Sequence, residues 1–223
     1  MSHIFSYLAP ETQFTAVVEW NSPGDAAIYN SENQHIMDIK TPPINIGKWV
    51  LSYIFCGMSC CNIGNKEVDG IHPQYGEILA LKELDPGTSC FKCQKGFNYG
   101  IVVGQTEICG SFHHSASLCS ESDTFRDPQN NVIFDISKEP VKTKKEEKVK
   151  LTKKRQVIFS KDEKPVCKID SKFTPKKTIS TFTFPAELSV QAKICLMMYT
   201  AMEAFEFKDE SQAFISNMFG GGN

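Results

Sequence analysis

The chain has 223 residues, of which 41% are hydrophobic and 22% charged, and these proportions are typical of a single globular domain with a sizeable core. Lys and Arg number 24 against 26 Asp and Glu, so the net charge of −2 excludes a general attraction to nucleic acid. The charge is nevertheless uneven, because residues 138–155 include nine basic and three acidic side chains.

The N-terminal residues and the cysteines indicate a compartment. The first twenty residues contain no basic segment followed by an apolar one, so we expect no secretory signal. The nine cysteines are then expected to be reduced thiols, available to a metal or to acylation rather than to disulfides. We therefore expect the protein on the cytoplasmic side of a membrane.

The chain upstream of residue 188 is predicted to form β-strands. Four segments repeat one layout, in which a short apolar run, a polar turn and an apolar alternation follow one another: 28–39, 68–81, 124–136 and 157–169. This layout is typical of β-hairpins. Further strands are predicted at FTAVVEW (14–20), KWVLSYIF (48–55) and YGIVVGQ (99–105), which brings the total to ten to twelve.

The most apolar window, LSVQAKICLMMYTAMEAFEF (188–207), is predicted to form one helix. Its length of about 30 Å would match a bilayer core. Lys193 and Glu203 lie inside it, however, and each charge near the middle of a membrane span costs about 2–3 kcal/mol. Ser189, Lys193, Thr200 and Glu203 fall on one narrow stripe of an otherwise largely apolar surface. The pattern favours a helix buried in protein, with this stripe touching water, over a membrane span.

Many strands followed by one apolar helix predict a mostly β fold. The expected architecture is a closed antiparallel barrel of about 12 strands that encloses the helix, because closure would pair the strand edges. A two-layer α+β sandwich is the alternative. The expected division is an N-terminal segment (1–13), the barrel domain with its central helix (14–207) and a polar C-terminal tail (208–223).

Four blocks, in this order, resemble the phospholipid scramblase family. They are YNSENQHIMDIK (29–40) followed by CGMSCC (56–61), GEILALKELDPGTSCFKC (76–93), SLCSESDTFRDPQNNVIFDISKEP (117–140) and TFTFPAELSVQAKICLMMYTAMEAFEF (181–207). The resemblance spans residues 14–206 and implies a tubby-like barrel around an apolar helix. It also implies calcium-activated, ATP-independent and bidirectional movement of phospholipids between leaflets, and palmitoylation of Cys-rich segments.

The calcium segment that the resemblance implies ends at the acidic residue after Phe184-Pro185, and here the chain departs from the family. Hard cations take several oxygen ligands. Lys176 and Thr178 stand where the family has acidic residues, so Glu187 is the carboxylate that remains. Calcium at Glu187 is thus implied by the family and opposed by the local charge. The alternative is a strand that runs into a capped helix.

Two cysteine clusters allow two chemistries. Cys90 and Cys93 stand in place of the family's longer cysteine run and are candidates for palmitoylation, where two acyl chains would anchor firmly and one reversibly. Cys56, Cys60 and Cys61, together with that pair, offer enough thiolates for a tetrahedral zinc site. Unmodified thiols in loops between strands are the third possibility.

The basic segment KTKKEEKVKLTKKR (142–155) is a candidate site for anionic phospholipid headgroups, since each Lys or Arg near such a surface contributes about 1 kcal/mol. Its candidate residues are Lys142, Lys144, Lys145, Lys148, Lys150, Lys153, Lys154 and Arg155. A solvated charged loop is the plain alternative. Nucleic acid is a weaker one, because no aromatic residues alternate with the lysines.

No motif points to an enzyme. The sequence has no nucleophile elbow, P-loop, GxGxxG or HExxH, and His113 and His114 on a strand would point to opposite faces. The first hypothesis is a scramblase-like protein on the cytoplasmic face of the plasma membrane or another membrane, with a possible cytosolic pool. The alternative is a non-transporting adaptor whose tubby-like barrel binds anionic phospholipids, proteins or DNA.

Overall fold

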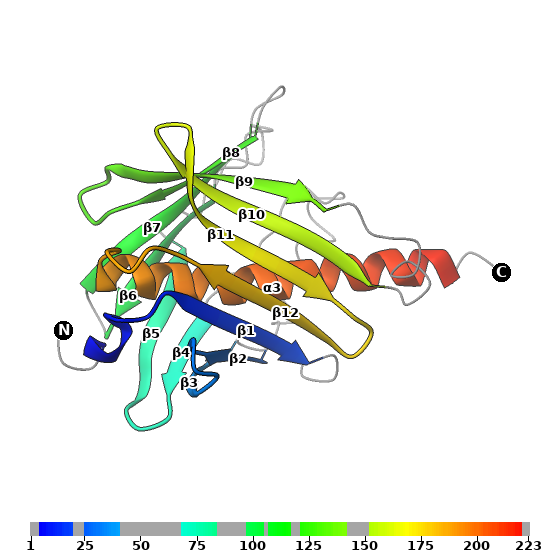
Figure 1. The fold of residues 1–223 in the computed structure, drawn as a ribbon, viewed down its shortest axis with the longest axis horizontal. Helices are drawn as coiled ribbons and strands as arrows, with labels where there is room; N and C mark the ends of the chain where they lie inside the picture. Colours follow the sequence, from blue (N-terminus) through cyan, green and yellow to red (C-terminus); the bar gives the residue numbers. More distant parts are fainter. Residues whose placement is uncertain are drawn as a thin grey trace, which may run out of the picture.

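The computed structural model describes residues 5–19, 25–40, 68–83, 97–104, 107–116, 121–141 and 152–219. These residues form a closed antiparallel barrel of twelve strands, with one long helix running through it (Figure 1). The predicted mostly β fold with an enclosed C-terminal helix is therefore confirmed. The predicted strand at 48–55 lies outside the described residues.

The elements follow the chain in a simple order. They are η1 Ser6–Leu8, β1 Gln13–Glu19, β2 Asp25–Tyr29, β3 His35–Lys40, β4 Val68–His72, β5 Gly76–Glu83, β6 Phe97–Val103, β7 Glu107–Ala116, β8 Glu121–Arg126, β9 Val132–Pro140, β10 Lys153–Lys161, β11 Lys164–Phe173, β12 Lys177–Thr183 and α3 Val190–Phe219. Each strand pairs with the next, and β1 pairs with β12 from Gln13↔Thr183 to Glu19↔Lys177, which closes the barrel.

All four predicted hairpins are present, as β2–β3, β4–β5, β8–β9 and β10–β11. The β10–β11 turn illustrates why polar residues were needed there. Asp162 and Glu163 have φ values of 51° and 63°, and two successive left-handed residues give a turn whose twist matches the flanking strands.

Alternation along the strands fills the interior with aromatic side chains. In β11 every second residue from Cys167 to Phe173 is buried. Phe159 packs against Phe134, Phe182 and, on the helix, Tyr199, with ring centroids 6.1, 5.5 and 5.5 Å away. A layer of aromatic rings from the strands therefore packs against the helix.

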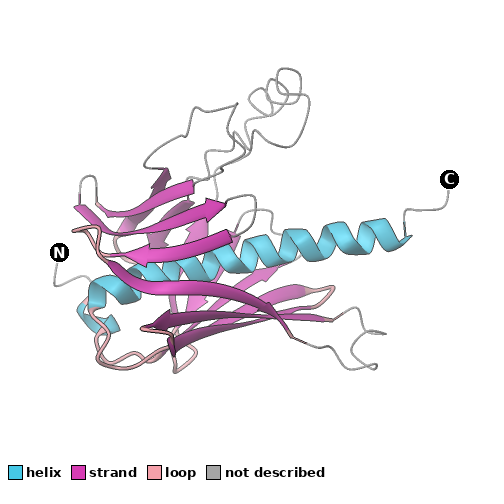
Figure 2. Ribbon diagram, turned by 90° about the horizontal axis from the view of Figure 1, so that it is seen from above, coloured by secondary structure: helices cyan, strands magenta, loops and turns pink. Residues whose placement is uncertain are grey.

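The helix is longer than the sequence analysis predicted. It starts at Val190, where the Ser189 hydroxyl accepts a hydrogen bond from the Ala192 N–H, and continues through residues 208–219, which were assigned to a polar tail. Its 30 residues span about 45 Å, so its C-terminal part leaves the barrel (Figure 2). In the described part of the chain no helix has the length and apolar character needed to cross a membrane.

Of the predicted polar stripe, Ser189 just before the helix is exposed, but the three members within the helix do not touch water, and for them the prediction was wrong. Lys193, Thr200 and Glu203 are at most 1% exposed. The Lys193 ammonium donates to the carbonyl oxygens of Leu8, Ala9 and Ala186, and the Thr200 hydroxyl donates to Leu196 O. Buried polar groups are tolerated when they are hydrogen-bonded, and here the residues around η1, the residues before α3 and the helix itself supply the partners.

The topology gives the barrel two different ends. The turn end holds the short β2–β3, β4–β5, β8–β9 and β10–β11 turns and the start of α3. The opposite end, from which α3 leaves, is called here the helix-exit end. The segments 20–24, 41–67, 84–96, 117–120 and 142–151, outside the described residues, all follow strands that end at the helix-exit end.

Candidate functional site

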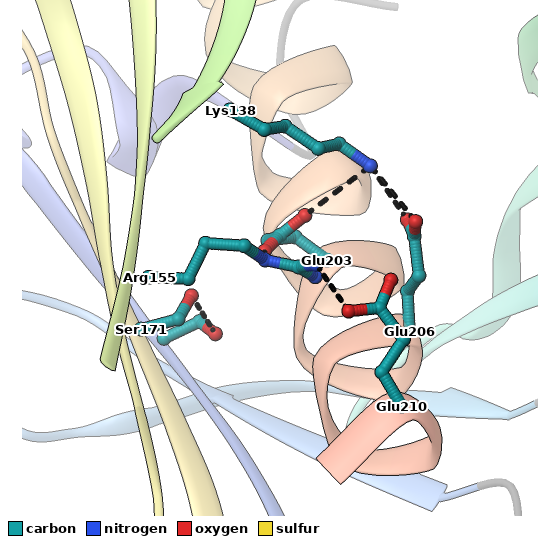
Figure 3. Close-up of polar contacts among 7 residues, drawn as sticks. Lys138, Arg155, Ser171, Glu203, Glu206 and Glu210 are labelled. Atoms are coloured by element: carbon teal, nitrogen blue, oxygen red, sulfur yellow. Dashed lines mark hydrogen bonds and ion pairs between the residues drawn. The ribbon is translucent and has the colours of Figure 1, made fainter. Parts of the chain in front are cut away.

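A cluster of five charged side chains lies where α3 leaves the barrel (Figure 3). Its centre is the ion pair between Glu203 on α3 and Arg155 on β10, with Arg155 Nε donating to Glu203 Oε1 over 2.6 Å. The Glu203 side chain is 0% exposed and that of Arg155 is 11% exposed. The Arg155 guanidinium also lies 4.7 Å from the centroid of the Phe207 ring.

Three partners surround this pair at the edge of the barrel. Arg155 Nη1 donates to Glu210 over 2.8 Å. Lys138 on β9 donates to both carboxylate oxygens of Glu206, at 2.9 and 2.8 Å, and lies 3.8 Å from Glu203. The cluster therefore joins the β9–β10 pair to the outgoing half of the helix by ion pairs.

The environment shifts the pKa values of the central pair. Burial, the largest cause, raises the pKa of Glu203 to about 7, although Arg155 and Lys138 act in the opposite direction. Burial would also lower the pKa of Arg155, but the carboxylates of Glu203, Glu210 and Glu206 hold it above its ordinary value. Glu203 is thus the acid in the described chain that titrates near neutral pH at this end.

We expect the stability of the barrel to fall as pH rises through the range in which Glu203 ionises. Its pKa is raised from 4.5 to about 7 on folding, so the folded chain binds this proton more tightly than the unfolded chain. The resulting stability is fully present below pH 4.5 and is lost as pH approaches and passes 7. The free energy of unfolding in urea should differ less between pH 5.5 and pH 8 for Glu203→Gln than for the unmodified chain.

The control for this measurement is Glu187→Gln, because Glu187 is an exposed carboxylate at the other end of the barrel. This variant should keep the pH dependence of the unmodified chain. Equal pH dependence in Glu203→Gln and the unmodified chain would contradict the assignment.

Of the eight predicted basic residues, the structure describes three. Lys142, Lys144, Lys145, Lys148 and Lys150 lie outside the described residues. Arg155 faces inward to Glu203 and Glu210, whereas Lys153 and Lys154 are half-buried at the start of β10. The alternation of Arg155 with buried Val157 and Phe159 was the sequence signal for this inward orientation.

Strand pairing brings further lysines close to the start of β10 at the helix-exit end. Lys172 near the end of β11, Lys176 in the following turn and Lys177 at the start of β12 are exposed. Lys172 lies opposite Lys154 in the β10–β11 ladder. We call Lys153, Lys154, Lys172, Lys176 and Lys177 the basic rim of the helix-exit end. Sequence analysis missed its last three members because they are distant from the basic segment along the chain.

The basic rim is poorly neutralised. Lys172, Lys176 and Lys177 form no ion pair with any other residue that the structure describes. Glu19 faces Lys177 across the β1–β12 ladder, without forming an ion pair with it. Lys172 also lies opposite Lys154 in the β10–β11 ladder, and like charges at directly opposite positions repel each other.

The segment compared with the scramblase calcium loop is a strand here. Thr178 is fully buried in β12, and Lys176 precedes this strand at the helix-exit end. Glu187 follows it at the turn end, and a strand of seven residues spans about 20 Å. Residues 176–187 therefore include a strand that leads to a helix capped by Ser189, and calcium binding at Glu187 stays a prediction.

The structure does not bring together a metal site from described residues. In the ranges given above, no group of three or more His, Cys, Asp or Glu side chains could hold a metal ion. Cys56, Cys60, Cys61, Cys90 and Cys93 lie outside those ranges. Their segments, 41–67 and 84–96, join strands at the helix-exit end. His113 and His114 are adjacent on β7, as predicted, and His113 bonds Ser111 Oγ.

Comparisons with known proteins do not assign the chain to a family. No protein-family model matches it, and no curated protein sequence does. The X-ray structure of a protein from Arabidopsis thaliana is similar at a TM-score of 0.44 and 10% sequence identity, covering 89% of this chain and 94% of that chain. A similarity of this degree establishes neither a family nor an activity.

Proposed function

We propose that this protein is a scramblase-like, tubby-like barrel that binds anionic phospholipid at the surface of a membrane through its helix-exit end. The observation that carries the proposal is the basic rim. Four lysines of β10, β11 and β12 lie at this end together with Lys176 between β11 and β12, and three of the five have no ion pair among the described residues. Phosphate groups of anionic lipids would supply the missing negative charge.

The strand order supports the same surface. The basic segment 142–151 and the cysteine segments 41–67 and 84–96 follow strands that end at the helix-exit end. Lysines of the segment would extend the basic rim, and acyl chains on Cys90 or Cys93 would enter the bilayer that the rim contacts. Electrostatic and acyl contacts together give firmer membrane attachment than either alone.

The proposal is tested by moving two charges between the ends of the barrel. We expect Lys176→Gln/Lys177→Gln to weaken binding to phosphatidylserine-containing vesicles by about thirtyfold, since each surface lysine contributes about 1 kcal/mol. Lys161→Gln/Lys164→Gln removes the same charge from exposed positions at the turn end and should change binding little. Vesicle co-sedimentation at two salt concentrations gives the affinities, and binding should weaken with salt.

The proposed surface would be overturned if the two double variants lost the same affinity for these vesicles. It would also be overturned if the unmodified chain bound pure phosphatidylcholine vesicles as tightly as phosphatidylserine-containing ones. The same vesicles, loaded with a fluorescent lipid, distinguish the two modes of action. Leaflet exchange, measured with and without Ca²⁺, would make the chain a scramblase. Binding without exchange would make it an adaptor. The barrel interior favours the adaptor, because the side chains of α3 and the strands fill it.

A further inference from the structure

A pocket of about 390 Å³ lies at the turn end of the barrel, opposite the basic rim. Its walls come from η1, the β2–β3 turn and the end of β4, and include Tyr7, Glu11, Glu32, His35 and His72. The volume is within the range of sites for small organic molecules, about 300–1,000 Å³. The proposed membrane surface lies at the other end of the barrel and does not include this pocket.

The walls of the pocket carry negative charge. Glu11 is 8% exposed, and hydrogen bonds from Asn30 Nδ2 and from the Ser31 backbone and hydroxyl hold its carboxylate in place. Glu32 adds a second, exposed carboxylate. Among the described residues that line the pocket, none is Lys or Arg. Lys193 is not a lining residue, but its ammonium, which donates to the carbonyl oxygens of Leu8 and Ala9, interacts electrostatically with Glu11 and offsets part of this charge. The pocket therefore favours a cation over an anion.

Aromatic rings form the adjoining wall. The ring centroids of Tyr7 and His72 are 5.9 Å apart with an interplanar angle of 57°, and Tyr75 packs on His72 at 4.8 Å. His72 Nδ1 accepts a hydrogen bond from Gln74 N, which is the arrangement of a neutral imidazole, and burial lowers the His72 pKa. Burial also raises the pKa of Tyr7 to about 12, so its ring stays uncharged. Neutral aromatic faces beside carboxylates attract methylated ammonium groups.

We propose that this pocket binds a small organic cation that carries a methylated ammonium group. The carboxylates of Glu11 and Glu32 supply the charge, and the rings of Tyr7 and His72 contact the methyl groups. Free hydroxyalkyl ammonium compounds and lipid headgroups share this chemistry.

The test compares choline with 3,3-dimethylbutan-1-ol, which has the same shape without the charge. In titrations of the full chain followed by calorimetry, choline should bind saturably, and the neutral alcohol should bind at least about tenfold more weakly. Glu32→Gln should weaken choline binding about threefold or more, because it removes one of the two carboxylates. Glu163→Gln, an exposed carboxylate in the β10–β11 turn, is the control and should leave it unchanged. Equal binding of choline and the alcohol, or no saturable binding of choline, would overturn the proposal.

A second pair of variants tests the aromatic contact. His72→Phe keeps an aromatic face and should retain choline binding, whereas His72→Ala should lose about threefold or more. Equal affinities of the two His72 variants would exclude the aromatic contact. Competition by phosphatidylcholine vesicles identifies a headgroup as the ligand, and saturable choline binding without such competition identifies a free solute.

Discussion

At pH 8, Arg155→Ala is expected to lower the free energy of unfolding by about 3–5 kcal/mol, which is the range for breaking a buried ion pair. Glu203, whose side chain is 0% exposed, would then lose the guanidinium that lowers its pKa, so at pH 8 it must either keep a buried charge without that partner or take up a proton at a cost in free energy. At pH 5.5 the loss should be smaller, because Glu203 can take up a proton. Urea unfolding monitored by fluorescence gives both values.

The matched control is Lys168→Ala, which removes the ion pair between Lys168 and Asp170. These side chains are 51% and 49% exposed, and exposed pairs contribute about 0–1 kcal/mol. Adding Glu203→Gln to Arg155→Ala should recover part of the stability, since it removes the uncompensated charge. A loss of less than about 1 kcal/mol for Arg155→Ala at pH 8 would show that the pair does not hold the helix in the barrel.

Phe159→Ala is the second change with a large expected effect, again about 3–5 kcal/mol. Phe159 is fully buried and contacts the rings of Phe134, Phe182 and Tyr199. Removing its ring opens a cavity between two strands and the helix, and that cavity cannot close unless α3 moves. Chemical denaturation at one fixed pH measures the loss.

Val166→Ala serves as the comparison, because Val166 is 37% exposed on the adjacent strand β11. Its effect should stay within about 0.5 kcal/mol, as for most surface substitutions. Phe159→Leu should fall between the two, because it retains part of the buried volume. Equal losses for Phe159→Ala and Val166→Ala would mean that the aromatic layer does not stabilise the enclosed helix.

Local patterns in the sequence were sufficient to predict the hairpins, the enclosed helix and the closed barrel. Period-two alternation and polar turns are properties of neighbouring residues, and an apolar helix after many strands has few places to be buried. The end of the helix was not predictable in the same way. Residues 208–219 are rich in polar side chains, yet Lys208 donates to Glu19 O at the end of β1, a contact that no local pattern contains.

The candidate site was harder to predict than the fold, because it is formed by contacts between residues that are distant in the sequence. Lys193 could not be recognised as buried, because the carbonyls that accept its hydrogen bonds belong mainly to Leu8 and Ala9. Lys172 and Lys177 join Lys154 only through the pairing of β10, β11 and β12. The pocket at the turn end brings together η1, β2–β3 and β4, whose residues carry no shared motif.

The pairing of β1 with β12 affects how the barrel assembles during translation. Gln13 meets Thr183, and the helix that fills the interior is synthesised after both strands. During translation the strands therefore emerge before α3, and their inward-facing apolar side chains are not yet covered. Such late, long-range assembly is slow and exposes the nascent chain to aggregation. The apolar face of the strands stays uncovered until α3 has also been synthesised.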